Sequence, residues 1–261
     1  MTDEMSLDHE TVAMQLADGE LAHVAPPADP WLLRRTMAWG ASEVPALLLA
    51  LGRARGVDVP DYIARRARAS SRARGQPRVI AEKAGIVAPL RVGRAAHLGT
   101  EREQELLAQW RAHLERGSYR CEAEELVIPA SVRHASVAPR CSLPWVDRHC
   151  TVLAATPDAW ADDALGAELI VECKCSTTER RELPWHWMVQ VQAQLAVTSA
   201  AWGLVVCGEM WAAEWAQDGP IRAWEVPRDE ALIETIRDAC REGWRRVEAL
   251  RAERAREEVA A

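Results

Sequence analysis

The sequence contains no phenylalanine and only two tyrosines, and it has no Lys or Arg between Met1 and Leu33. No apolar run approaches the ~20 residues that a membrane-spanning helix needs, so we expect no membrane segment. The first residues, MTDEMSLDHE, lack the basic and apolar regions of a secretory signal peptide. The seven cysteines are odd in number and show no paired framework. We therefore expect a cytoplasmic protein with reduced thiols.

The composition is that of a soluble globular protein. Of the 261 residues, 49% are hydrophobic and 27% are charged, and the formal net charge is −7. This net charge argues against a protein that simply coats DNA. Between Gly52 and Arg94, however, eleven Lys and Arg stand against three Asp and Glu, a local balance of 11 − 3 = +8. Such a run is typical either of a solvated helix face or of a surface for a polyanion.

The pattern of apolar residues predicts an α/β fold in which a central mixed sheet is flanked by helices. Helices are expected at 42–52, with Ser42 as the N-cap and Gly52 at the end, at 98–117, at 184–202 and from about 229 onward. Strands are expected at 124–129, 150–155 and 167–175, and in the segments GLVVCG, MWAAEW and IRAWEV. We expect an acidic, loosely ordered lead-in at 1–29 and a single domain over 30–261, with a basic segment at 53–94.

One strand combines an apolar stretch with charged residues, in the segment AELIVECKCST. Because side chains alternate along a strand, Glu172 and Lys174 share one face while Val171 and Cys173 share the other. The ADDALG turn allows Asp158 to lie beside Glu172 on an adjacent strand. Two carboxylates brought together repel each other unless one is protonated or a cation lies between them, and oxygen ligands suit Mg²⁺ or Mn²⁺. An exposed ion pair on an edge strand is the alternative.

Two further features could complete such a site. Gln190 and Gln194 lie one helical turn apart, which predicts a polar stripe that points into a site. Glu103 begins a periodic helix, from which a third carboxylate could approach the metal. A glutamate in a first helical turn is also favoured simply by the helix dipole.

The arrangement Asp158…Glu172-x-Lys174 resembles that of the PD-(D/E)xK nucleases. Together with other motifs it resembles the phage-type 5′→3′ exonucleases, the family of lambda exonuclease and the YqaJ-type viral recombinase nucleases. The motifs follow one another in that family's order over about 31–207. They are W-x-x-x-R (Trp31, Arg35), GASEV (Gly40 to Val44), G-x-x-x-E (Gly99, Glu103), TPD (Asp158), ECK (Glu172, Lys174) and QVQ (Gln190, Gln192).

The resemblance implies roles for individual residues. The implied catalytic residues are Asp158, Glu172, Lys174, Gln190 and Glu103, of which Asp158, Glu172 and Glu103 surround a pair of Mg²⁺ ions, with Mn²⁺ as a substitute. In such enzymes the lysine activates water. Arg35 and Ser42 are the implied anchors of a DNA 5′-phosphate, in keeping with the free N–H groups of a helix N-terminus. The basic segment would track the DNA backbone. Its candidate residues are Arg65, Arg66, Arg68, Arg72 and Arg74.

The implied function is Mg²⁺-dependent 5′→3′ digestion of one strand of linear duplex DNA, which prepares 3′ single strands for recombination. The implied partners are DNA ends, a single-strand annealing protein and further copies of the chain in a trimeric ring, in a bacterial or phage-infected cell. A restriction- or repair-type endonuclease and a catalytically inactive DNA-end-binding module are the alternatives. The cysteines, with His113, His134 and His149, lack the C-x-x-C spacing typical of a zinc or iron–sulfur site.

Overall fold

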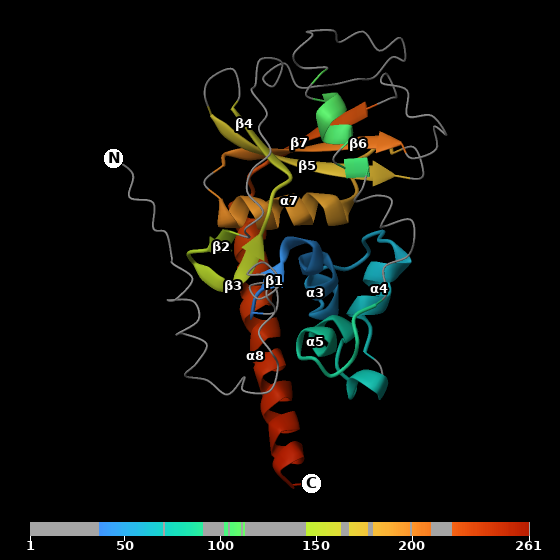
Figure 1. Ribbon diagram of the computed structural model, residues 1–261, viewed down its shortest axis with the longest axis vertical. Helices are drawn as coiled ribbons and strands as arrows, with labels where there is room; N and C mark the ends of the chain where they lie inside the picture. Colours follow the sequence, from blue (N-terminus) through green and yellow to red (C-terminus); the bar gives the residue numbers. More distant parts are fainter. Residues whose placement is uncertain are drawn as a thin grey trace.

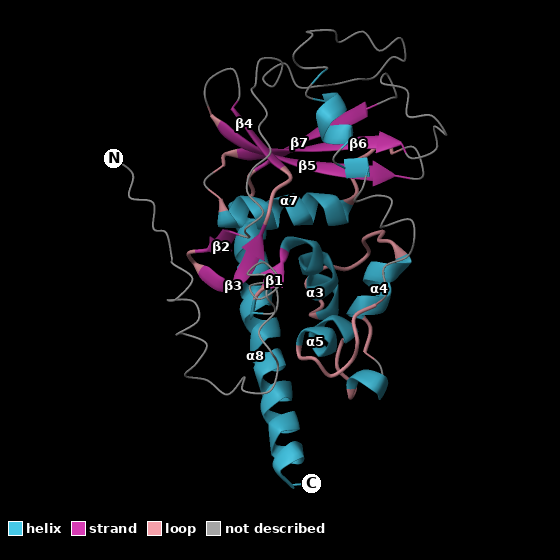
Figure 2. Cartoon of the chain, viewed as in Figure 1, coloured by secondary structure: helices cyan, strands magenta, loops and turns pink. Residues whose placement is uncertain are grey.

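The described part of the chain begins with short elements, mostly helices, and continues with most of its strands, followed by the long helix α8 (Glu230–Ala260) (Figures 1 and 2). The structure is a computed structural model that describes residues 37–69, 71–90, 102–103, 105–110, 112, 145–162, 167–176, 180–198, 200–209 and 221–260. The strands expected at 124–129 and in MWAAEW lie outside these residues, as do the lead-in at 1–29 and Arg35.

The elements before residue 91 are short. They are β1 (Trp39–Gly40), the 3₁₀ turn η1 (Ala41–Glu43), α3 (Val44–Ala50), α4 (Asp61–Ala67), the 3₁₀ turn η2 (Ser71–Ala73) and α5 (Arg78–Lys83). Gly52 follows α3 with a φ of +69°, a left-handed conformation that glycine adopts without strain, as its predicted place at the helix end requires. Residues 105–110 are also helical, inside the range 98–117 predicted from periodicity.

The second half of the described chain carries most of the strands. It contains β2 (Trp145–Asp147), β3 (Cys150–Ala155), β4 (Ala159–Asp162), β5 (Glu168–Ser176), α7 (Trp185–Val197), β6 (Trp202–Glu209), β7 (Ile221–Pro227) and α8 (Glu230–Ala260). The expected strands 150–155, 167–175, GLVVCG and IRAWEV and the helix from about 229 are therefore confirmed within one or two residues.

The larger sheet has the strand order β4-β5-β6-β7. β5 and β6 are parallel, and α7 connects them, while the outer pairs are antiparallel. In Figure 1, α7 lies along one face of this sheet. Leu106, Leu107 and Trp110 pack in one buried cluster with Val171 and Cys173 of β5. The sheet is thus covered by helix on both faces.

The β5 strand divides its side chains as the alternation predicts. Leu169, Val171 and Cys173 belong to the cluster with helical residues 105–110. Ile170 belongs to the second cluster, together with Val191 and other residues of α7. Glu172 and Lys174 follow Ile170 in register, so the charged pair lies on the α7 face of the sheet. The packing of β5 therefore determines which helix the ion pair meets.

The remaining strands form a second, smaller sheet with the order β1-β3-β2. The predicted α/β fold with mixed sheet and flanking helices is confirmed. Its strands, however, are divided between two mixed sheets instead of one. The division falls between β3 and β4, at the segment that contains Pro157, which has no amide hydrogen for a strand ladder. β4 then pairs with β5 while β3 pairs with β1 and β2.

The helix α8 packs against the smaller sheet and the N-terminal helices. Arg237 donates to the buried Asp147 carboxylate of β2, with Nε 2.6 Å from Oδ2. At Gly243 an added Cβ would lie 2.7 Å from Leu47 Cδ1 and 3.0 Å from Trp39 Cζ2, so a larger residue would displace these side chains between α8 and α3. None of the described helices is both long and apolar enough to cross a membrane. The described cysteines, Cys150, Cys173, Cys175, Cys207 and Cys240, carry free thiols.

Candidate active site

Glu172 is a buried carboxylate on the central strand β5 of the larger sheet. It is 2% exposed, and three side chains donate hydrogen bonds to it. Lys174 and Gln190 donate to Oε1, and Gln194 donates to Oε2. Both amides come from α7, one turn apart, so the polar stripe predicted from their spacing points at this carboxylate. A buried carboxylate with three donors is held in one orientation.

Asp158 lies opposite Glu172 across the β4–β5 pair. The antiparallel register pairs Ala159, the first residue of β4, with Val171. Asp158, the residue before β4, therefore lies beside Glu172. The backbone N–H of Cys173 donates to Asp158 Oδ2 at 2.7 Å. Burial raises the pKa of Asp158 well above its usual range, and the negative charge of Glu172 raises it further, against the opposite effects of Lys174 and this hydrogen bond. The two carboxylates are therefore close enough to repel each other.

Lys174 and Glu103 complete the charged cluster. Burial opposes the charged form of Lys174, but the charges of Glu172, Asp158 and Glu103 outweigh it and raise the pKa of the ammonium. Burial also raises the pKa of Glu103, which is close enough to respond to both Lys174 and Glu172. Of the five predicted catalytic residues, the three carboxylates thus lie close enough to act on the charge of Lys174, and Gln190 contacts Glu172 directly.

The donor set fits a hard divalent cation in its chemistry. Asp158, Glu172 and Glu103 supply oxygen atoms, and the mutual repulsion of the first two is the condition that a cation relieves. Within the described part of the chain, no three His, Cys, Asp or Glu side chains are gathered closely enough to hold a metal ion. The oxygens of Glu172 are instead engaged by Lys174 and the two amides. The metal therefore stays a proposal.

Ser42 does not cap a helix, contrary to the sequence-based expectation. It lies exposed inside the turn η1, and α3 begins two residues later at Val44. The Glu43 side chain instead accepts the Gly40 backbone N–H at 2.9 Å. A carboxylate three residues beyond Gly40 can reach back to that N–H and caps the turn. The turn that contains Ser42 contacts α7, the helix that carries the glutamines.

Glu43 is the centre of a buried ion cluster. Its Oε2 lies 2.7 Å from Lys83 Nζ, and its Oε1 lies 3.3 Å from Arg66 Nη2. Burial opposes ionisation of Glu43. The Lys83 ammonium, the Gly40 N–H and Arg66 outweigh this effect and hold the pKa of the carboxyl below its usual range.

This cluster predicts an acid-sensitive contribution to stability. A carboxyl whose folded pKa is depressed stabilises the fold above its unfolded pKa of about 4.3 and loses that effect as the pH falls through its folded pKa. We expect Glu43→Gln to be less stable than the wild type at pH 7, with a difference that shrinks below pH ~4. Chemical unfolding of both proteins between pH 3 and pH 7 measures this. A difference independent of pH would contradict it.

The basic segment is less free than its composition indicates. Arg66 also pairs with Glu82 at 2.9 Å, and Arg74 pairs with Glu257 of α8 at 2.8 Å. Arg65 pairs with Asp61 in the same helix. Arg68 is exposed and has no ion pair within the described residues, and the side chain of Arg72 lies outside them. A DNA-binding role for these five arginines stays a prediction, and Arg68 is the best placed for it.

Sequence reasoning gave two site residues too little weight or missed them. The sequence analysis noted Gln194 only as the partner of Gln190 in the stripe, yet its amide donates to the second oxygen of Glu172. Gln192 of the QVQ motif instead donates to the Pro227 carbonyl at 2.7 Å. Arg180 was missed because it follows β5 without a periodic signal. Its Nε donates to Ser176 Oγ at 3.2 Å, and it pairs with no carboxylate among the described residues.

Two residues with ionisable rings, Tyr62 and His186, also lie near Lys174. Tyr62 of α4 is 56% exposed. Partial desolvation raises the pKa of Tyr62, and the positive charges of Lys174 and Arg66 lower it by a smaller amount. Burial lowers the pKa of His186 to about 4, and the charges of Arg180 and Lys174 lower it too. The charge of Lys174 therefore acts on a residue of α4 and on a residue of α7.

Comparison with solved structures supplies the context for this site. No family model and no curated protein matches the sequence. The structure is similar to that of an alkaline exonuclease, LHK-Exo, from Laribacter hongkongensis, with a TM-score of 0.57, 18% identity, and coverage of 88% of this chain and 97% of that one. It is also similar to a phage-related exonuclease from Haemophilus somnus 129PT, with a TM-score of 0.51, 10% identity, and coverage of 83% and 96%. The resemblance to phage-type exonucleases is therefore confirmed at the level of the fold, which this chain shares over nearly the whole length of both enzymes.

Proposed function

We propose that the chain is a Mg²⁺-dependent 5′→3′ exonuclease that digests one strand of linear duplex DNA from a 5′-phosphorylated end. The observation that carries the proposal is the Glu172–Lys174 pair on β5, held by Gln190 and Gln194 with Asp158 opposite. A purely structural ion pair would not need a second, repelling carboxylate beside it. The solved exonucleases with the same fold support this function. LHK-Exo has also been solved in complex with dAMP, a mononucleotide of the kind that such digestion releases.

The side chains have separate tasks in this reaction. Gln190 and Gln194 fix the orientation of Glu172, and the Cys173 N–H fixes that of Asp158. Lys174 presents its ammonium beside both carboxylates, where it can donate to an attacking water or to a phosphate oxygen as negative charge develops there. Asp158 and Glu172, with Glu103, would hold Mg²⁺. When bound, the ion polarises the phosphate and lowers the pKa of a coordinated water.

Two further groups would bind the DNA phosphates: Arg180, and the pair formed by Ser42 and Arg35. Arg180 contacts Ser176 at the end of β5 and has no carboxylate partner among the described residues, so its guanidinium can donate two parallel hydrogen bonds to a phosphate. Ser42 lies exposed in the turn that contacts α7, as an anchor for a terminal phosphate requires, and Arg35 is its proposed partner. The digestion would leave 3′ single strands for recombination.

The proposed setting follows the same family. Double-stranded DNA ends are the substrate, a single-strand annealing protein takes over the product, and three copies of the chain form a ring around the duplex. The reaction takes place in the cytoplasm of a bacterial or phage-infected cell.

The test compares linear duplexes that carry a 5′-phosphate or a 5′-hydroxyl, and closed circular duplex, each with Mg²⁺ and with EDTA. If Ser42 and Arg35 hold the terminal phosphate, one or two charge-assisted hydrogen bonds of about 1.5–3 kcal/mol each distinguish the two ends. We expect phosphorylated ends to be digested at least about tenfold faster, because ~1.4 kcal/mol corresponds to a factor of ten. Arg35→Ala should erase this preference more than it slows digestion of hydroxyl ends.

The controls separate the exonuclease from its alternatives. Closed circles should survive, because they offer no end. Ready cleavage of circles would replace the proposal with an endonuclease that uses the same metal site. Binding of DNA ends without any cleavage would replace it with an inactive end-binding module.

A further inference from the structure

A pocket of about 540 Å³ lies between α8 and the β2–β3 hairpin. Its described lining residues are Arg148, His149, Cys150, Thr151, Val152, Arg241, Trp244 and Arg245. None of these belongs to the candidate active site. The β2–β3 hairpin belongs to the smaller sheet, whereas Glu172 and Lys174 lie on β5 of the larger sheet, which Figure 1 shows on the other side of α7. A ligand in this pocket would therefore leave the active site free.

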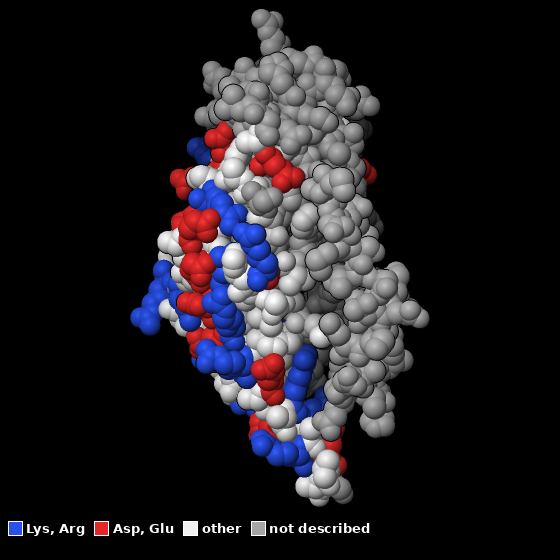
Figure 3. Space-filling model, turned by 90° about the vertical axis from the view of Figure 1, so that its left-hand side faces the viewer, with Lys and Arg blue, Asp and Glu red and all other residues white. Residues whose placement is uncertain are grey.

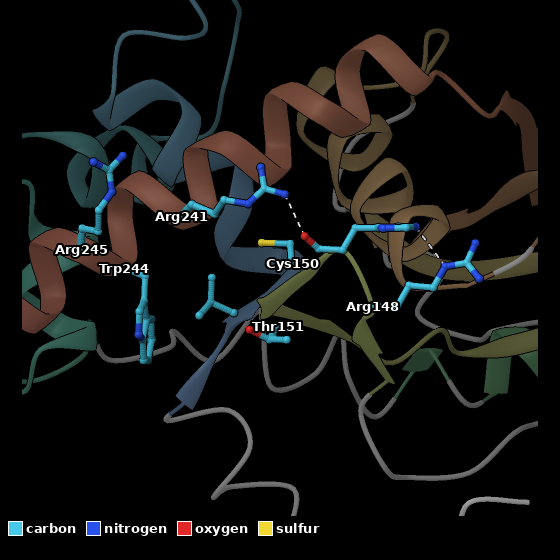
Figure 4. A pocket seen from close by; sticks show the side chains of 8 residues that line it. Arg148, Cys150, Thr151, Arg241, Trp244 and Arg245 are labelled. Carbon is cyan, nitrogen blue, oxygen red and sulfur yellow. Dashed lines mark hydrogen bonds between the residues drawn. The ribbon is translucent and has the colours of Figure 1, made fainter. Parts of the chain in front are cut away.

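The pocket combines an apolar wall with a row of positive charge. Figure 4 shows Arg245, Arg241 and Arg148 in succession along it, with Trp244 and Thr151 below. No acidic side chain is among the described residues that line it. Arg241 pairs with Asp238 at 2.9 Å, but Arg245 pairs with no acidic side chain in the described part of the chain. Arg148 donates to His149 Nε2 at 3.0 Å, so among the described residues neither Arg148 nor Arg245 has a carboxylate partner.

The walls of the pocket are held in place before any ligand arrives. Arg241 Nη2 donates to the His149 carbonyl at 2.8 Å, which joins α8 to the hairpin turn. Trp244 packs edge-on against the buried Trp39, with ring centroids 6.4 Å apart. The Trp39 Nε1–H in turn donates to the Cys240 carbonyl at 3.0 Å. A site that needs no rearrangement spends little of its binding free energy on ordering.

We propose that this pocket binds an acidic peptide segment of a partner protein. Its carboxylates would pair with the arginines, and one apolar side chain would lie against Trp244, Val152 and Cys150. Arginine forks match carboxylates bidentately, and a Trp beside arginines is the composition of an interface hot spot. The occupant is defined by this chemistry: several Asp or Glu close to one large apolar residue.

A nucleic acid strand fits the surroundings less well. A polynucleotide needs a basic track that continues over several phosphates. Outside the pocket α8 alternates in sign, with Glu234, Asp238, Glu242 and Glu248 among its arginines. Figure 3 likewise shows blue and red side chains interspersed over the described part of this face. A short acidic peptide would contact only the local positive cluster.

The test uses the full chain and a fluorescently labelled peptide of about ten residues, mostly Asp and Glu, with one Phe. We expect saturable binding that weakens as salt increases, because the arginines are exposed to solvent. Arg245→Glu should lower the affinity at least about tenfold through loss of one pair and gain of one repulsion. Replacing the Phe of the peptide with Ser should also weaken binding.

Arg256→Glu is the matched control. It makes the same charge change on α8, at an exposed residue outside the pocket, and should leave the affinity unchanged within about twofold. Absence of saturable binding, or equal affinity for the wild type and Arg245→Glu, would overturn the proposal. So would a single-stranded oligonucleotide that displaces the peptide and loses affinity in Arg245→Glu. Arg245→Glu should digest DNA normally, so this result is independent of the proposed nuclease function.

Discussion

Alanine in place of Lys174 is expected to abolish strand cleavage, with a fall in rate of at least about 10²-fold, or ~3 kcal/mol. The physical reason is that Lys174 presents the ammonium that lies beside both Glu172 and Asp158. Without this ammonium, the negative charge that develops on a phosphate oxygen is repelled by the two carboxylates, and no positive side chain beside them offsets that repulsion. Single-turnover digestion of a 5′-phosphorylated duplex at saturating Mg²⁺ measures the chemical step.

The structure indicates that this variant will fold. Gln190 and Gln194 still donate to Glu172 when Lys174 is gone, so the carboxylate keeps two of its three donors. The buried side chains Val171 and Cys173 on the opposite face of β5, and Ile170 on the α7 face, keep their packing. Arg256→Ala is the matched control, since it removes an exposed positive charge far along α8. Near-normal cleavage by a folded Lys174→Ala protein would remove Lys174 from the active site.

Asparagine in place of Asp158 is expected to eliminate Mg²⁺-dependent digestion, again by about 10²-fold or more. The side chain keeps its shape, and its amide oxygen can still accept the Cys173 N–H that now bonds to Oδ2. What it loses is the negative charge that would hold the cation. Because that charge is repelled by Glu172, we also expect the metal-free variant to melt at a higher temperature than the metal-free wild type.

Calorimetric titration with Mg²⁺ and Mn²⁺ separates these effects from a general loss of structure. Wild type should bind the ions and gain stability from them, and Asp158→Asn should do neither. Asp238→Asn, which neutralises an exposed carboxylate of α8, is the control and should behave as wild type. Undiminished metal binding by Asp158→Asn, or full wild-type activity in EDTA, would show that the carboxylates serve another purpose.

Local periodicity was sufficient to predict the core of the site. The alternation along β5 placed Glu172 and Lys174 together, because successive side chains of any strand point to opposite faces. The spacing of Gln190 and Gln194 placed both on one helical face, because four residues make about one turn. Both predictions depend on geometry within a single element, and the structure confirms both placements.

The charged residues of the N-terminal half were harder to interpret. Arg74 pairs with Glu257, 183 residues away, and Arg53 pairs with Glu242 across 189 residues. A count of charges along 52–94 therefore overestimates the positive field of that segment, because α8 supplies the counter-charges. The sequence analysis missed the cap at Gly40 for a related reason. Ser42 is of the residue type preferred at an N-cap, but it is the Glu43 side chain that accepts the Gly40 N–H. Lys83 and Arg66, from distant parts of the chain, stabilise the Glu43 carboxylate there.

The sequence by itself determined the α/β class, the strands β3, β5, β6 and β7, the helices α7 and α8, the charged pair on β5 and the glutamine pair on α7. These follow from periodicities of two and about four residues, which are local properties of the backbone. Only the tertiary structure decided that the strands divide into two sheets, that the Gln190–Gln194 face of α7 meets Glu172, and that an arginine-lined pocket forms between α8 and the β2–β3 hairpin. Each of these depends on which surfaces pack together, and that choice is made by burial summed over the whole chain rather than by any one segment.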